Sequence, residues 1–109
     1  MVSNTSKATL TLARRRLLEL MQSINFGRIE NLIVRGGEPS LVPPPRVVRE
    51  VKFGGDNGPR PELATDDFRL KAQVVDLFRE LDRLGSGTVE ALEVKHGLPF
   101  RLLVAEAIA

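Results

Sequence analysis

Hydrophobic residues recur at helical spacing in two stretches of the chain, and each stretch is followed by a run that alternates like a β-strand. In the second stretch, Thr65 is a natural N-cap, and Asp66 and Asp67 suit the first turn of a helix. The first predicted helix carries one apolar stripe: Leu10, Ala13, Leu17, Met21 and Ile24. The second carries Val74, Leu77 or Phe78, Leu81 and Leu84.

The run after each helix reads Gly-x-Ile/Val-Glu-x-Leu-x-Val and is followed by a turn. Alternation places Leu32 with Val34 on one face of a strand, and Leu92 with Val94 on one face of the other. Each turn contains glycine, which supplies the positive φ that a tight hairpin needs. The two turns are Gly36-Gly37 and His96-Gly97.

The two runs form an internal repeat. Residues 27–39 align with residues 87–99 at a shift of 60, and six of the thirteen columns are identical. We align the preceding helices at a shift of 57, which leaves three extra residues around Gly85-Ser86 in the second copy. The identical columns are Gly27/Gly87, Glu30/Glu90, Leu32/Leu92, Val34/Val94, Gly37/Gly97 and Pro39/Pro99.

A helix followed by Gly-x-Val-Glu and a glycine hairpin resembles the YezD-like family of very small bacterial proteins of unknown function. The motif stretches that carry the resemblance cover about a third of this chain. It implies one helix plus one hairpin per unit and implies no function or site. The residues that carry it are Gly27, Ile29, Glu30 and Gly37, and again Gly87, Val89, Glu90 and Gly97.

These patterns predict an α+β fold of two tandem helix–β-hairpin units (αββ-αββ), related by a pseudo-twofold axis, with two helices packed on one antiparallel sheet. We expect a single domain over residues 1–109, with repeats 10–53 and 66–107 joined by a Gly/Pro loop, 54–65. The pattern alone does not decide whether the two hairpins share one sheet.

Two segments lie outside the simple repeat. The alternation from Arg46 to Phe53 predicts an extra strand with one wet side and an apolar face formed by Val47, Val51 and Phe53. The end of the chain, 100–109, is a strand by analogy with the first unit, or a terminal helix because it is rich in Ala and Leu.

Composition narrows the possible chemistry. The 109 residues include no cysteine and one histidine, so disulfides, zinc fingers, iron–sulfur clusters and thiol catalysis are excluded. The sequence lacks a signal-peptide pattern and an apolar stretch long enough to span a membrane. We therefore expect a soluble, cytoplasmic protein that is not an enzyme and carries no cofactor or metal.

Charge differs between the two halves: residues 1–60 contain ten Lys and Arg against five Asp and Glu, and residues 61–109 contain six against nine. The halves could attract each other, or the basic half could attract an anionic partner. Neither Tyr nor Trp is present to stack on bases. The candidate phosphate-binding residues are Arg46, Arg49, Lys52 and Arg60.

Three further features carry possible chemistry. Glu30 and Glu90, which alternation places on the side of Leu32 and Leu92, could form a pseudo-symmetric carboxylate pair; rim carboxylates paired with Arg or Lys are the commoner case. His96 is a turn residue, because its counterpart is glycine. The run 14–16 of three arginines fans around a helix, which favours a solvated face or a border of the apolar stripe.

Residues that perform chemistry are scarce, so we expect an interaction module that binds a protein partner or itself. The alternative is a nucleic-acid-binding protein that uses the basic strand 46–60. Membrane binding is not expected.

Overall fold

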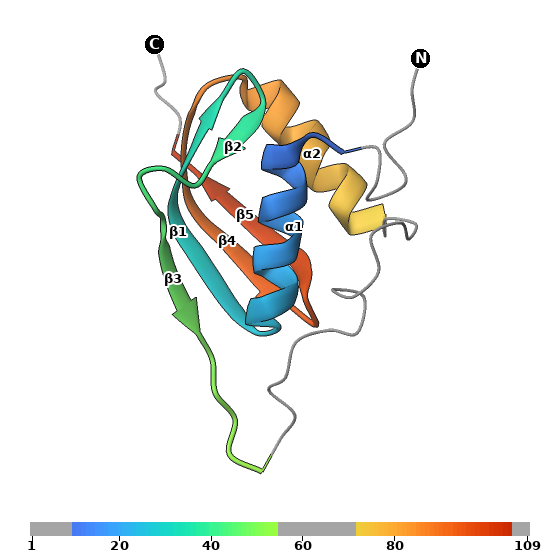
Figure 1. Ribbon diagram of the computed structural model, residues 1–109, viewed down its shortest axis with the longest axis vertical. Helices are drawn as coiled ribbons and strands as arrows, with labels where there is room; N and C mark the ends of the chain where they lie inside the picture. Colours follow the sequence, from blue (N-terminus) through green and yellow to red (C-terminus); the bar gives the residue numbers. More distant parts are fainter. Residues whose placement is uncertain (1–9, 55–71, 106–109) are drawn as a thin grey trace.

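Each predicted helix is present and is followed by the strands predicted after it (Figure 1). The computed structural model describes residues 10–54 and 72–105. The first unit contains α1 (Leu12–Ile24), β1 (Gly27–Arg35), β2 (Glu38–Ser40) and β3 (Arg46–Arg49). The second contains α2 (Ala72–Leu84), β4 (Gly87–Lys95) and β5 (Leu98–Val104). The predicted cap residues Thr65, Asp66 and Asp67 lie outside the described residues.

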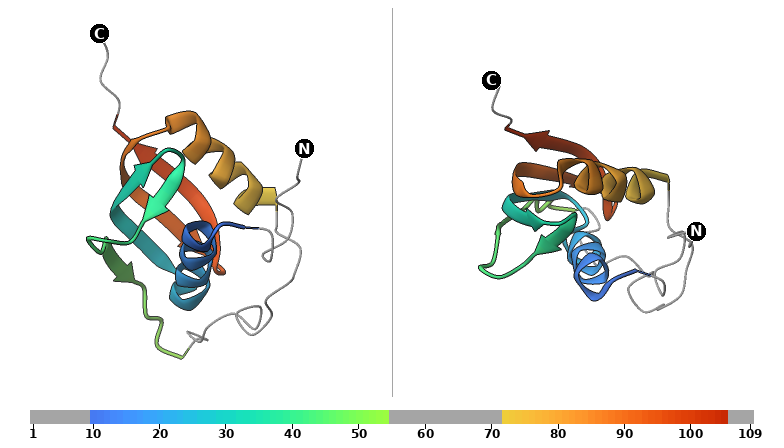
Figure 2. Two further views of the ribbon diagram at one scale, coloured as in Figure 1. Left: turned by 45° about the horizontal axis from the view of Figure 1, so that its top comes forward. Right: turned by 90° about the horizontal axis from the view of Figure 1, so that it is seen from above.

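All strands belong to one antiparallel sheet with the order β2-β1-β4-β5, and β3 also pairs with β1. The central strands β1 and β4 pair symmetrically, with Gly27 opposite Val94 and Val34 opposite Gly87. This register is that of two equivalent strands related by a pseudo-twofold axis. Both helices lie on the same face of the sheet (Figures 1 and 2). The predicted fold class is therefore confirmed, and the two hairpins do share one sheet.

The core lies between the two helices and the sheet. The stripe predicted for the first helix is buried except for Ala13, which is half-buried, and its first member, Leu10, lies just before α1. In α2, Leu77 and Phe78 are both buried, so the two alternatives for that position both belong to the core. Side chains that are less than 2% exposed come from both units: Leu17, Leu18, Met21, Ile24, Ile29, Leu32, Val34, Val74, Leu81, Val89 and Leu92.

One shift of 60 residues relates both the helices and the strands of the two units. α1 covers residues 12–24 and α2 covers residues 72–84, so the alignment of the helices at 57 is wrong. Because apolar residues recur every three or four positions in both helices, an alignment shifted by three residues still places apolar residues over apolar residues in most columns. The helix ends fix the true shift, because Asn25 (φ 64°) and Gly85 (φ 73°) both follow the last helical residue in a left-handed conformation.

The hairpin of each unit is bound to the helix end of the other. The Gly37 N–H donates to the carbonyl of Gly85 at 2.7 Å, and the Gly97 N–H donates to the carbonyl of Asn25 at 2.9 Å. These two hydrogen bonds are equivalent under the shift of 60. The units therefore interlock reciprocally.

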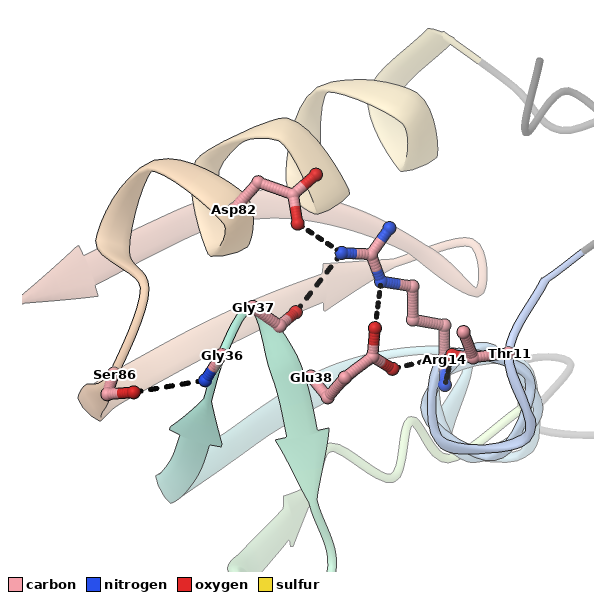
Figure 3. A network of polar contacts seen from close by, with 7 residues as sticks. All are labelled: Thr11, Arg14, Gly36, Gly37, Glu38, Asp82 and Ser86. Carbon is pink, nitrogen blue, oxygen red and sulfur yellow. Dashed lines mark hydrogen bonds and ion pairs between the residues drawn. The ribbon is translucent and has the colours of Figure 1, made fainter. Parts of the chain in front are cut away.

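Arg14 joins the two units at one end only (Figure 3). Its side chain is 7% exposed and forms an ion pair with Asp82 of α2. Its Nη2 donates to the Gly37 carbonyl at 3.2 Å, and its Nε lies 3.4 Å from Glu38 Oε2. The expectation of a solvated or bordering arginine is wrong for Arg14, because the second unit covers it. In the repeat, Val74 occupies the position of Arg14.

The segments outside the simple repeat are both strands. Residues 100–104 belong to β5, which settles the choice between strand and helix for them, and residues 106–109 lie outside the described residues. The predicted extra strand is shorter than expected and covers Arg46–Arg49. Its expected apolar face is exposed, since Val47, Val51 and Phe53 are 42%, 57% and 99% exposed. β3 is held in the sheet by antiparallel pairing with β1.

Candidate interaction surface

β5 forms a free border of the sheet. β4 pairs with one of its edges, and within residues 10–54 and 72–105 no strand pairs with the other edge. An unpaired edge presents a row of N–H and C=O groups that can pair with another strand. Pro99 and a register shift with β4 at Phe100 interrupt the start of this row, and the residues from Arg101 to Val104 are consecutive partners of β4 without proline. The edge can therefore form main-chain hydrogen bonds over most of its length.

A groove of about 200 Å³ runs beside this edge, between α2 and β5. We call it the α2–β5 groove. Phe100, one of its lining residues, is 56% exposed, whereas half-buried Leu102 packs against the core. An apolar groove with an exposed aromatic side chain is typical of a binding surface. Its lining residues include Asp76, Leu77, Glu80, Leu92, Pro99, Phe100 and Leu102.

The opposite border of the sheet is broken into two short strands. β2 has three residues and β3 has four, and residues 41–45 separate them. This connection contains three prolines and the cis peptide bond Val42-Pro43. Short strands and prolines are common means of preventing edge pairing. The two borders of the sheet therefore differ, and β5 is the longer, uninterrupted strand.

The outer face of the sheet carries alternating charges across its strands. Glu30 accepts a hydrogen bond from Arg28 Nε at 2.5 Å and lies 3.4 Å from Arg46 Nε. Glu93 accepts a hydrogen bond from Arg101 Nη2 at 2.7 Å. The hydrogen bond from Arg28 lowers the pKa of Glu30, and the same contact raises the pKa of Arg28. These charges largely neutralise one another, which is typical of a solvated sheet face.

Two of the four predicted phosphate-binding residues already make contacts with other side chains. Arg46 is paired with Glu30, and Lys52 Nζ lies 4.3 Å from the centre of the Phe26 ring and 4.0 Å from Glu50. Arg49 is exposed. Arg60 lies outside the described residues, so the structure does not place it beside the others.

The predicted relation between Glu30 and the apolar face of its strand is wrong. Ile29 and Leu32 are both buried, because the alternation breaks at Asn31, whose φ is 60°. Glu30 is half-exposed and forms its ion pairs with arginines, and Glu90 is exposed. The described residues contain no group of three or more acidic or histidine side chains that could hold a metal ion.

His96 occupies the turn position that the repeat predicts. Its φ is 55°, and the equivalent residue of the first unit, Gly36, has φ 57°. Its ring contacts Phe26 edge to face, with the ring centres 4.8 Å apart. The contact links the second hairpin to the end of the first helix. His96 therefore has a structural role at this turn.

The sequence interpretation missed the features that make β5 a candidate binding surface. Residues 98–104 read Leu-Pro-Phe-Arg-Leu-Leu-Val, with one charge among seven residues. That low charge was a usable signal, because an edge strand exposed to water usually carries more charge or proline. Deciding that this strand is an edge required the sheet order.

Comparison of the chain with protein-family models, curated proteins and solved structures finds no match. Neither helix in the described part of the chain is long and apolar enough to cross a lipid bilayer.

Proposed function

We propose that this chain is a protein-interaction module that binds an added β-strand at the free edge of β5. The observation that carries the proposal is the unpaired edge from Phe100 to Val104, which lies directly beside the apolar α2–β5 groove. Main-chain hydrogen bonds along an edge provide affinity for an extended segment. Pockets for alternate side chains provide specificity.

The groove supplies such a pocket. Leu77 comes from the helix, Leu92 from the neighbouring strand and Leu102 from the edge strand itself. Every second side chain of an added strand points to the helix-covered side of the sheet. An apolar residue there would enter the groove, and its neighbours would face the solvent.

Nucleic-acid binding by the basic segment 46–60 remains the second candidate, with less support. Arg46 already pairs with Glu30, and Lys52 stacks on Phe26, so a phosphate would have to compete with both contacts. The described residues contain no assembled group of catalytic side chains that would support an enzyme function. We also propose that the module is cytoplasmic and binds no cofactor.

Selection from a displayed library of random ten-residue peptides tests the proposal. We expect enrichment of peptides with alternating apolar residues and no proline at their centre, because these can pair as strands. Phe100→Asp should abolish their binding by placing a charge beside the groove. Phe53→Asp is the matched control, because Phe53 is 99% exposed and does not line the groove. Equal binding to both variants would refute the β5 site.

A further inference from the structure

We infer that the strand added at β5 is the β5 strand of a second copy of this chain, so that two copies form a twofold-symmetric dimer with one continuous sheet. The inference rests on the proposed function, because it names the partner that occupies the same edge. Twofold dimers use the same surface patch on both copies, so the patch must be complementary to itself.

The surface around β5 meets that requirement. It offers a groove lined by Leu77 and Leu92 and, beside it, the protruding ring of Phe100. When two such edges pair antiparallel, each copy presents Phe100 to the groove of the other. Both copies then bury a large aromatic side chain that the single copy leaves 56% exposed.

Charge is also complementary. Lys95 Nζ lies 4.0 Å from the centre of the Phe100 ring, so the protruding group is an aromatic ring with a cation on it. Asp76 and Glu80 line the groove on the helix side, and their side chains are 71% and 50% exposed. Their ion pairs are with neighbouring residues of the same helix, at 4.0 Å and 3.1 Å. The dimer brings the cation of each copy to the acidic rim of the other.

The one charge on the pairing strand does not oppose this arrangement. Arg101 also lines the groove, but it donates to Glu93 at 2.7 Å, so each copy neutralises its own arginine. The opposite border is a poorer dimer edge, because residues 41–45 interrupt it. The chain also already contains an antiparallel junction between equivalent strands, β1 with β4.

Sedimentation equilibrium over protein concentrations from about 1 to 500 μM tests the inference. We expect a reversible dimer that Phe100→Asp weakens at least about 100-fold, because two buried rings are lost in each dimer. Phe53→Asp should leave the dimer unchanged, and circular dichroism should show that both variants are folded. A dimer that Phe53→Asp disrupts and Phe100→Asp does not would place the contact at the other border and overturn the inference.

Spin-label distances provide a second readout, because the chain has no cysteine and each variant would carry a single thiol. In the dimer, labels at Arg101→Cys should lie within about 20 Å of each other across the paired strands, and labels at Val47→Cys about 30 Å or more apart. A wild-type chain that is monomeric at every concentration overturns the inference. If selected peptides still bind at β5 in that case, the proposed function stands. If none binds, both fail.

Discussion

Arg14 should stabilise the fold by fastening the two units together at their pseudo-symmetric interface. The perturbation is Arg14→Val, which copies the residue that the repeat places at the equivalent position, Val74. Val74 is 1% exposed, so an apolar side chain is compatible with burial at that position of the helix. The substitution removes two strong contacts, the ion pair with Asp82 and the hydrogen bond to the Gly37 carbonyl, together with the longer 3.4 Å pair with Glu38.

The expected loss can be estimated from these two contacts. The side chain of Asp82 is 60% exposed, so it regains water and the lost ion pair costs about 1 kcal/mol. The buried Gly37 carbonyl loses its donor from Arg14, at a cost of about 1 to 2 kcal/mol. Valine in place of arginine adds about 0.5 kcal/mol through its lower helix propensity. We expect a total loss of about 2.5 to 3.5 kcal/mol.

Urea denaturation followed by far-UV circular dichroism measures this loss. Arg16→Val is the matched control, because Arg16 lies in the same helix, is exposed, and carries the same propensity cost. It should lose only about 0.5 kcal/mol. In the repeat, Gln22 is equivalent to Asp82 and Val74 is equivalent to Arg14, so the double variant Arg14→Val with Asp82→Gln reproduces the pair found at the other end of the interface. The double variant should recover about 1 kcal/mol of the lost stability, because the glutamine amide can donate to the Gly37 carbonyl. Equal losses for the two single valine variants would refute the reasoning.

Gly37→Ala should destabilise the fold by about 1 to 2 kcal/mol more than Gly36→Ala in thermal denaturation. Both glycines have positive φ, but only at Gly37 would the new Cβ meet an Asp82 oxygen, at 2.5 Å. Equal losses would contradict this. Glu30 should titrate below its ordinary pKa of 4.5 in carboxyl NMR, and Arg28→Gln should raise that pKa. Because the folded-state pKa is depressed, this stabilisation is present above the ordinary pKa and is lost as the pH falls through the lowered pKa; an unchanged pKa in Arg28→Gln would refute the assignment. A chain cut once between residues 55 and 71 should remain a complex on size exclusion, since reciprocal hydrogen bonds join the units; separation of the fragments in native buffer would contradict the interlocked sheet.

The fold class was predictable because it depends on patterns that survive small errors. The two apolar helix stripes, the repeated strands and the glycine turns all recur, and together they require two similar units. The exact alignment of the helices and the face on which Glu30 lies were harder to predict from the sequence. The helix alignment slipped by three residues because apolar steps of three and four tolerate such a shift. The face of Glu30 was wrong because Asn31 takes a left-handed conformation in the middle of a strand.

Features that depend on contacts between the units could not be obtained from local pattern. Arg14 looks like a surface residue in a basic run, and only the position of Asp82 in the other unit explains its burial. The same holds for β5. Its low charge is visible in the sequence, but only the sheet order shows that no strand in the described part of the chain pairs with its second edge.

Amide hydrogen exchange tests most directly whether the free edge of β5 is the interaction surface. It would be measured on the chain alone at low concentration and then with a saturating strand, either a selected peptide or a second copy at high concentration. We predict slower exchange at residues 100–104 and no change at residues 46–49. Protection that appears at residues 46–49 and leaves residues 100–104 unchanged would contradict the account.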